Sequence, residues 1–292
     1  KDPKTGESKQ GYYRQYDDRT RYAAHVVGFH NENGRSGAEA FHIKYLMGYN
    51  NHIFERIYQK AFLPKERGNN VVLTIDIQLE EYISKLLGNN KGSVVLMNPK
   101  TGEILGMVSS PSFNPNNMSD VETDNLIDRS VQGLYPPGSI FKVITAASAL
   151  ESVEDIDSWK FNCTGSLAVG DKEVSCYGGQ AHGELDLAGA LIYSCNGAFA
   201  ELGNKIGWQS LLAKGEKFGF NKNFLFADLK INDSKLNLNK STSAIDIAWT
   251  SVGQGTTLVT PMHMAMVASA VANDGVMMEP KLLYSVVGRR GS

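Results

Sequence analysis

The chain has 292 residues, of which 42% are hydrophobic and 21% charged. This composition is typical of a globular protein with a sizeable core, and the length allows one large domain or two ordinary ones. The formal net charge of −2 argues against a nucleic-acid-binding surface, and no apolar run reaches the ~18 residues that a membrane-spanning helix needs.

The first 62 residues are rich in Tyr, Asn and Arg and show little regular periodicity. We therefore predict a small, loop-rich module over 1–62, followed by a charged, turn-like linker at 64–70. An α/β pattern begins with a short strand of mainly β-branched residues over 71–75. Asp76 is placed as the N-cap of a helix that ends at Gly88.

Two further strands are predicted over 93–97 and 103–109, joined by a turn into a hairpin. A Pro-Pro-Gly turn then leads into an apolar, Ala-rich run over 140–150, which predicts a buried helix with Ser139 near its N-terminus. Residues three apart on a helix lie roughly 5–6 Å apart on one face, so Lys142 can meet the hydroxyl of Ser139. If burial lowers its pKa, the amine can remove that hydroxyl's proton. A capping serine and a solvated lysine are the ordinary alternative.

The rest of the chain alternates irregular and helical segments. Irregular strands and turns are predicted over 161–183, helices start after a cap-and-proline pair at Thr260 and elsewhere, and a last strand is expected near the end. The predicted helices cover 185–192, 197–206, 208–218, 244–252 and 261–272, and the last strand covers 281–287. These elements predict an α+β (α/β) fold, in which an antiparallel sheet accompanies a helical lobe.

A second motif, Ser194-Cys195-Asn196, interrupts two of these helices. A hydroxyl and an amide two residues apart can face one cleft from a tight turn, where the hydroxyl relays a proton and the amide holds a substrate carbonyl or amide. At a helix boundary both residues are usually caps. The order Ser-x-x-Lys, then Ser-x-Asn, is the combination found in penicillin-binding proteins and serine β-lactamases.

The chain has three cysteines, too few for a disulfide framework. Cys163 and Cys176 lie thirteen residues apart and could pair in an oxidising compartment, or both could be unpaired small hydrophobic residues. Cys176 and His182 lack the paired spacings of zinc sites. We therefore predict no metal site and no cofactor.

The chain resembles a class B penicillin-binding protein, the monofunctional D,D-transpeptidase of peptidoglycan synthesis. Besides the two motifs, the resemblance rests on residues 21–28, 34–39, 71–78, 94–116, 128–130, 182–187, 251–261 and 272–275. It implies the penicillin-binding/β-lactamase-like transpeptidase fold. It also implies a partial N-terminal pedestal (dimerisation-like) module over 1–62 and a transpeptidase domain over 63–292.

The resemblance also implies roles for four residues. Ser139 would form the acyl-enzyme with a stem peptide and would be acylated by β-lactams. Lys142 would be its base, Ser194 would relay the proton to the leaving D-Ala, and Asn196 would orient the substrate amide. The implied partners are stem peptides, β-lactams and a membrane glycosyltransferase of wall synthesis. The implied location is the cell membrane, with a single N-terminal anchor outside this chain and an extracytoplasmic catalytic domain.

The family has a third motif, Lys-Thr-Gly, on a strand downstream of Ser-x-Asn. The two such triplets in this chain, Lys4-Thr5-Gly6 and Lys100-Thr101-Gly102, both precede Ser139, so neither is that motif. We therefore expect this chain to lack the C-terminal part of the transpeptidase domain, and we expect the activity in the parent protein.

Two alternatives to a transpeptidase remain. A serine β-lactamase or β-lactam sensor of the same superfamily would need a deacylating base, such as a glutamate in a dedicated loop, and no such loop is evident in the sequence. A non-catalytic wall-assembly scaffold would keep the fold as a binding module, an alternative that the missing Lys-Thr-Gly motivates.

Overall fold

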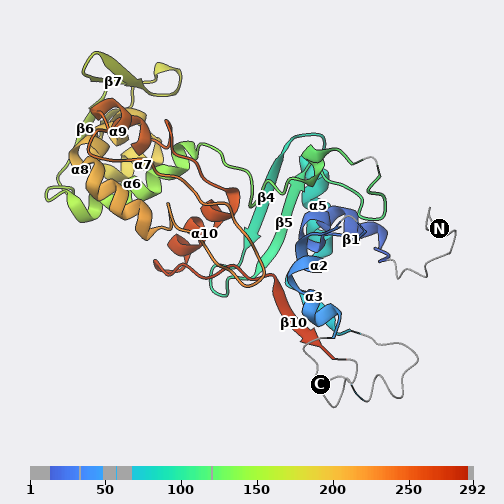
Figure 1. Ribbon diagram of the computed structural model, residues 1–292. Helices are drawn as coiled ribbons and strands as arrows, with labels where there is room; N and C mark the ends of the chain where they lie inside the picture. Colours follow the sequence, from blue (N-terminus) through green and yellow to red (C-terminus); the bar gives the residue numbers. More distant parts are fainter. Residues whose placement is uncertain (1–13, 33, 49–56, 58–67, 120, 289–292) are drawn as a thin grey trace. The chain divides into compact units, whose positions relative to one another are not determined.

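The computed structural model describes residues 14–32, 34–48, 57, 68–119 and 121–288. The chain divides into two compact units, whose elements Figure 1 labels. The first unit consists of Lys1–Ser130, Leu225–Lys230 and Ala272–Ser292, and the second of Val131–Phe224 and Ile231–Val271. The domain boundary predicted between residues 62 and 63 lies outside the described residues and stays a prediction.

The first unit opens with short elements, as the weak periodicity of this region predicts. They are the 3₁₀ helix η1 (Asp18–Ala23), α1 (Ala24–Val27), the strand pair β1 (His30–Asn31) and β2 (Gly34–Arg35), α2 (Gly37–Phe41) and α3 (Ile43–Leu46). Asp17 caps η1 by accepting a hydrogen bond from the backbone of Arg19. The buried carboxylate of Glu39 accepts a hydrogen bond from Arg14.

The strands of the first unit form two antiparallel pairs. β3 (Asn70–Leu73) pairs with β10 (Leu283–Val287), and β4 (Gly92–Met97) pairs with β5 (Ile104–Ser110). Helix α5 (Ile77–Leu87) packs against β5, and the side chain of Asp76 caps it by accepting from Gln78 N at 2.8 Å. The predicted strands, cap and hairpin of this region are therefore confirmed.

The Lys100-Thr101-Gly102 triplet forms the turn of the β4–β5 hairpin. Its backbone is held by Asn98, whose side-chain oxygen accepts from Lys100 N at 2.9 Å, and Gly102 has a φ of +80°. A residue with a side chain would be strained there. This triplet serves a turn, as predicted, while Lys4-Thr5-Gly6 lies outside the described residues.

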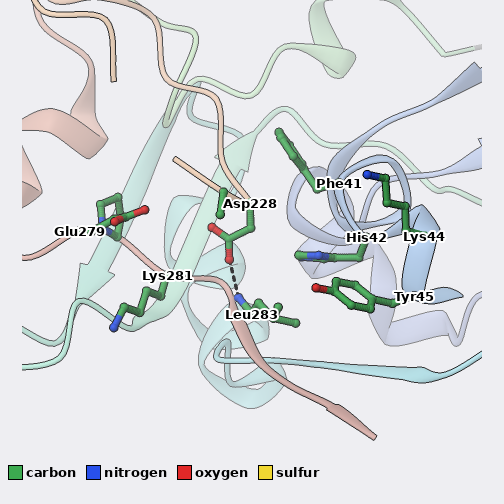
Figure 2. Close-up of a pocket in the computed structure, with 10 residues that line it drawn as sticks. Phe41, His42, Lys44, Tyr45, Asp228, Glu279, Lys281 and Leu283 are labelled. Carbon is green, nitrogen blue, oxygen red and sulfur yellow. Dashed lines mark hydrogen bonds between the residues drawn. The ribbon is translucent and has the colours of Figure 1, made fainter. Parts of the chain in front are cut away.

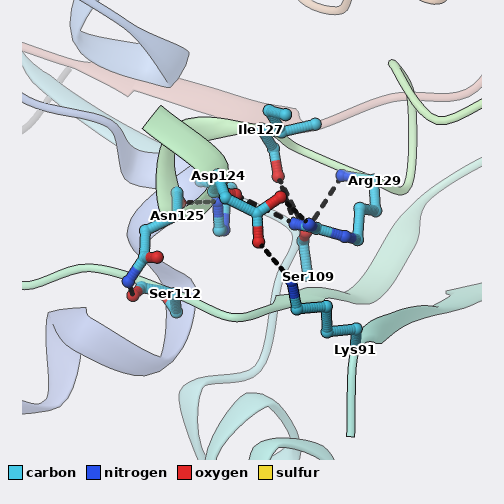
Figure 3. Close-up of polar contacts among 8 residues, drawn as sticks. Lys91, Ser109, Ser112, Asp124, Asn125, Ile127 and Arg129 are labelled. Carbon is cyan, nitrogen blue, oxygen red and sulfur yellow. Dashed lines mark hydrogen bonds and ion pairs between the residues drawn. The ribbon is translucent and has the colours of Figure 1, made fainter. Parts of the chain in front are cut away.

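A polar network fixes the segment around the 3₁₀ helix η2 (Thr123–Leu126), as Figure 3 shows. The carboxylate of Asp124 accepts from Arg129 at 2.5 Å and from Lys91 at 3.0 Å. The backbone N–H of Arg129 donates to Ser109 Oγ at 2.9 Å, which ties this segment to β5. The chain thus leaves the first unit from a well-held position.

The second unit is mainly helical. Its helices are α6 (Lys142–Ser152), α7 (Leu187–Ile192), α8 (Asn196–Lys217), α9 (Ala244–Ser251) and α10 (Pro261–Ala272), with 3₁₀ helices η3 (Gly138–Phe141) and η4 (Tyr177–Gly179). Two antiparallel strand pairs accompany them, β6 (Phe161–Cys163) with β9 (Gly183–Leu185) and β7 (Ser166–Val169) with β8 (Lys172–Ser175). Together with the strand pairs of the first unit, these elements confirm the predicted α+β class.

Helix α8 forms the centre of this unit, because both α6 and α9 pack on it. Gly203 allows the close approach of α9, since a Cβ at that position would lie 1.8 Å from Ser251 Oγ. The two predicted helices over 197–206 and 208–218 are one continuous element with a break at Gly207, whose φ is +76°. No described helix is long and apolar enough to cross a membrane.

Candidate active site

Ser139 lies on a turn whose backbone is held from the opposite side of the site. Gly138 adopts a φ of +59° and donates its N–H to the carbonyl of Gly253 at 2.8 Å. The Pro-Pro-Gly run thus ends in the 3₁₀ helix η3, and α6 begins directly at Lys142. Ser139 is exposed, whereas only 1% of Lys142 is exposed. The serine hydroxyl can therefore meet a substrate while the amine behind it stays shielded from water.

The amine of Lys142 lies among four oxygen atoms. Its Nζ is 3.1 Å from Ser139 Oγ, 2.9 Å from Ser194 Oγ, 2.7 Å from the Ser194 carbonyl oxygen and 2.7 Å from Asn196 Oδ1. The structure thus brings together all four residues that the sequence singled out. Its contact with both hydroxyls is the geometry expected of a group that moves a proton between them.

The protonation state of Lys142 follows from these contacts. Burial lowers the pKa of Lys142 to about 8, against the opposing effect of negative charge at Cys195 and Cys176. An ammonium has only three N–H donors, fewer than the four oxygen atoms around it. A neutral amine donates to the two carbonyl-type oxygens and accepts from a serine O–H with its lone pair. The site therefore suits the neutral amine, the form that acts as a base.

The turn that carries Ser194 is held in an uncommon conformation. Ser194 has a φ of +51°, in the left-handed region that costs a non-glycine residue about 1–3 kcal/mol. Asn196 opens helix α8, and its side-chain N–H donates to the Ser175 carbonyl oxygen at 2.9 Å. This bond leaves the amide oxygen of Asn196 directed at Lys142. The strain persists because the surrounding contacts fix the turn.

A cleft of about 360 Å³ opens beside these residues. Its lining consists of Ser139, Tyr177, Gln180, His182, Tyr193, Ser194, Asn196, Val252 and Gln254. The sequence analysis did not assign site roles to Tyr177, Gln180 or Tyr193, because single polar and aromatic residues in irregular segments carry no distinguishing pattern. Tyr177 is 96% exposed, which leaves its ring free to contact a ligand in the cleft.

All three cysteines of the chain lie together next to this cleft, with one histidine. Their ligand atoms, three Sγ and His182 Nδ1, all lie within 4.8 Å of one another. We call this group the Cys₃His cluster: Cys163, Cys176, His182 and Cys195. The three thiols are free and buried. The suggested Cys163–Cys176 disulfide is therefore not formed in this structure, and these four side chains are the described residues best suited to hold a metal ion.

The thiols of the Cys₃His cluster have different acidities. Burial raises the pKa of Cys195 to about 12. Burial also acts on Cys163, but the backbone N–H groups of Gly165 and His182 outweigh it and lower the pKa of that thiol to about 7. Neighbouring thiolates repel one another, so the three thiols do not all ionise together without a positive charge between them.

The first unit contains a separate pocket of about 450 Å³, shown in Figure 2. Its lining consists of Phe41, His42, Lys44, Tyr45, Ala227, Asp228, Glu279, Pro280, Lys281 and Leu283. Asp228 accepts from the backbone N–H groups of Leu282 and Leu283 at 2.9 and 2.6 Å, so its carboxylate holds the chain before β10. This lining has no serine or cysteine to act as a nucleophile, so the candidate active site is the cleft at Ser139.

The chain is similar to known proteins over most of its length. Residues 92–291 match the family described as the penicillin-binding protein transpeptidase domain. The chain is 31% identical to the peptidoglycan D,D-transpeptidase PbpA of Mycolicibacterium smegmatis, over 95% of this chain and 61% of that protein. It therefore spans about three fifths of the length of this relative.

Two solved structures have a similar fold. One is penicillin-binding protein A from M. tuberculosis as a penicillin G acyl-enzyme complex, with 28% identity, a TM-score of 0.86, and coverage of 97% of this chain and 71% of that one. The other is the D,D-transpeptidase domain of a peptidoglycan glycosyltransferase from Eggerthella lenta, with 31% identity, a TM-score of 0.78, and coverage of 93% and 67%.

Proposed function

Because the chain belongs to the penicillin-binding protein transpeptidase family, we propose that it is a serine D,D-transpeptidase that cross-links the stem peptides of peptidoglycan. The observation that carries this proposal is the position of the Lys142 amine between the hydroxyls of Ser139 and Ser194, at 3.1 and 2.9 Å. The similarity to peptidoglycan D,D-transpeptidases supports the choice of substrate.

In the first half-reaction, Ser139 Oγ attacks the carbonyl carbon of the penultimate D-Ala of a stem peptide. The neutral amine of Lys142 takes the hydroxyl proton, and the backbone N–H of Ser139 stabilises the oxyanion that forms. The C–N bond then breaks. The leaving amine of the terminal D-Ala takes a proton from the Lys142 ammonium through the Ser194 hydroxyl, which leaves an ester on Ser139 and a neutral lysine.

In the second half-reaction, an amine of another stem peptide attacks the ester carbonyl. Its proton passes to Lys142, the C–O bond to Ser139 breaks, and the serine oxygen takes the proton back from the ammonium. The new amide is the cross-link. Asn196 supports both steps, because its oxygen holds the Lys142 amine at 2.7 Å and its amide group lines the cleft, where it orients the substrate amide.

A β-lactam follows the first half-reaction only. Ser139 opens the four-membered amide ring, and the released amine stays attached to the acyl group. No carboxylate is among the described residues that line the cleft, so we expect no base that activates water for rapid hydrolysis. This favours a stable adduct over the turnover of a β-lactamase, and it agrees with the acyl-enzyme complexes of the similar protein from M. tuberculosis.

We place the protein at the cell membrane, with its catalytic domain on the outer side, where peptidoglycan is cross-linked. The N-terminal anchor would lie outside this chain. A membrane glycosyltransferase is the expected partner, because glycan strands must be polymerised before their peptides are joined.

The test is labelling of the full-length protein with a fluorescent penicillin. Ser139→Ala should abolish the label, whereas Ser158→Ala should keep it, because Ser158 is an exposed serine of the same unit that bonds only to the Asp155 carbonyl oxygen. Label that survives Ser139→Ala would overturn the proposal. Rapid turnover of nitrocefin would favour a β-lactamase, and a correctly folded protein that takes no label would favour a scaffold.

A further inference from the structure

We propose that the Cys₃His cluster is a structural zinc site that anchors the turn carrying Ser194 and Asn196. The sequence gave no sign of it, because the four side chains are thirteen, six and thirteen residues apart and lack the paired spacings of common zinc motifs. The proposal stands on the geometry of the folded chain.

The distances within the cluster match the edges of a tetrahedral zinc site. With Zn–S near 2.3 Å and Zn–N near 2.0–2.1 Å, tetrahedral geometry requires sulfur atoms about 3.8 Å apart and sulfur–nitrogen distances of about 3.6 Å. The Sγ atoms of Cys163 and Cys195 each lie 3.7 Å from that of Cys176. His182 Nδ1 lies 3.4 Å from Cys163 Sγ. One ion can therefore contact all four atoms after small adjustments.

Two simpler explanations fit less well. A disulfide needs sulfur atoms about 2.05 Å apart, and it would leave the third cysteine without a bonding partner. Buried cysteines that only fill space in a core do not require an imidazole nitrogen directed at them. Here every cysteine of the chain converges with one histidine nitrogen, which is a ligand set of zinc.

The local backbone holds each ligand in place. Cys163 ends strand β6, whose pairing with β9 sets it opposite Gly183, and its carbonyl oxygen accepts from His182 N at 3.2 Å. Cys176 N donates to the Gly165 carbonyl oxygen at 2.9 Å. Cys195 caps helix α8, and Ala198 N donates to its sulfur at 3.4 Å. Four protein ligands close the coordination shell, as in structural rather than catalytic zinc sites.

The position of the cluster connects it to the catalytic turn. Cys195 lies between Ser194 and Asn196, and Cys176 directly follows Ser175, the residue whose carbonyl oxygen accepts the Asn196 amide. A zinc ion would therefore clamp the two segments that this single hydrogen bond joins. It would hold the positive φ of Ser194 and keep the Asn196 oxygen on Lys142. His182 also lines the cleft, so the site borders the space for the substrate.

The first measurement is the metal content of the full-length protein, purified with its thiols reduced. We expect about one zinc per chain, as a closed four-ligand site predicts, and thiolate-to-cobalt charge-transfer absorption after exchange with Co²⁺. His182→Ala and Cys163→Ser should lose the zinc and this absorption. His30→Ala, a histidine of the first unit, should keep both. His182 is only half-buried, so its variant remains informative if the cysteine variant fails to fold.

The second measurement is the rate of acylation by a β-lactam after removal of zinc by a chelator. This readout rests on the proposed function, whereas metal content and cobalt absorption do not. We expect a fall of up to roughly 10²-fold, because a displacement of about 1 Å can have that effect on a catalytic group, and recovery when zinc is returned. Acylation that is unaffected by zinc removal would overturn the anchoring role. Protein without zinc, zinc retained by both ligand variants, or a disulfide found within the cluster by mass spectrometry would overturn the site itself.

Discussion

The two units each bury one ionisable side chain almost completely, and they treat it differently. Glu80 in the first unit is 0% exposed, and Lys142 in the second is 1% exposed. One oxygen of Glu80 accepts from Met107 N at 2.6 Å, and the other has no hydrogen-bond partner. The amine of Lys142 has four oxygen atoms within 3.1 Å.

Burial drives both groups toward the neutral form. It raises the pKa of Glu80 to about 7 and lowers that of Lys142 to about 8. Glu80 bonds β5 and leads to no exposed reactive group, whereas Lys142 contacts two exposed serines. A shifted pKa alone therefore does not mark a catalytic residue. The contact between a shielded proton acceptor and an exposed hydroxyl does.

The largest test of this contrast is Lys142→Met, which keeps an unbranched side chain and removes the amine. We expect β-lactam acylation to slow by roughly 10²–10⁴, the usual contribution of a general base. In the parent protein the rate should rise with pH through about 8, because the neutral amine is the active form, and the variant should lose this rise. Stopped-flow measurement of acylation across pH gives both results.

Lys214→Met is the matched control. Lys214 is also a buried lysine of the second unit, but it pairs with the carboxylate of Glu151 rather than with a serine. Its replacement should leave the acylation rate and the pH profile as they are. If both variants slowed acylation equally, burial of a lysine in this unit, and not its contact with Ser139, would be what matters.

Much of the fold and the reacting groups could be predicted from the sequence, because local rules determine them. The cap at Asp76, the hairpin around Lys100 and the helix after Thr260 each follow from turn and capping chemistry within a few residues. The Ser139–Lys142 pair follows from helical spacing.

The rest of the site depends on contacts between distant residues. No local pattern shows that Gly253 meets Gly138, or that Cys163 and Cys195 reach the same point. Tyr177 and Tyr193 are ordinary aromatic residues in the sequence, and only the folded chain puts them around the cleft. Nearest-neighbour rules thus find the groups that react, and tertiary contacts select the residues around them.

Gly253→Ala tests whether the turn before Ser139 matters as much as the burial of Lys142. Gly253 has a φ of +81°, and a Cβ there would lie 1.9 Å from the Gly138 carbonyl oxygen. Since that contact must shift the turn, we expect acylation to fall by up to roughly 10²-fold. Gly255→Ala is the control, because Gly255 has a similar φ of +75° with nothing within 4 Å of its Cβ. Equal loss in both variants would assign the effect to backbone strain and not to the Gly138 contact.

Glu80→Gln should have the smallest effect, and it acts on stability rather than on acylation. The pKa of Glu80 is about 7 when folded, against 4.5 for the ordinary group. Between these values the folded state binds more protons than the unfolded one, so stability falls as pH rises through this window. At 1.36 kcal/mol per pKa unit the loss reaches about 3 kcal/mol above pH 7. Glutamine keeps an acceptor for Met107 N and removes the charge, so the variant should be more stable than the parent near pH 8 and about equal near pH 5. Denaturant unfolding at both pH values measures this. Glu81→Gln should not flatten the profile, because the ion pair with Lys85 lowers the pKa of Glu81. An unchanged slope in Glu80→Gln would mean that Glu80 is ionised in the folded chain, and the comparison with Lys142 would then fail on the side of the first unit.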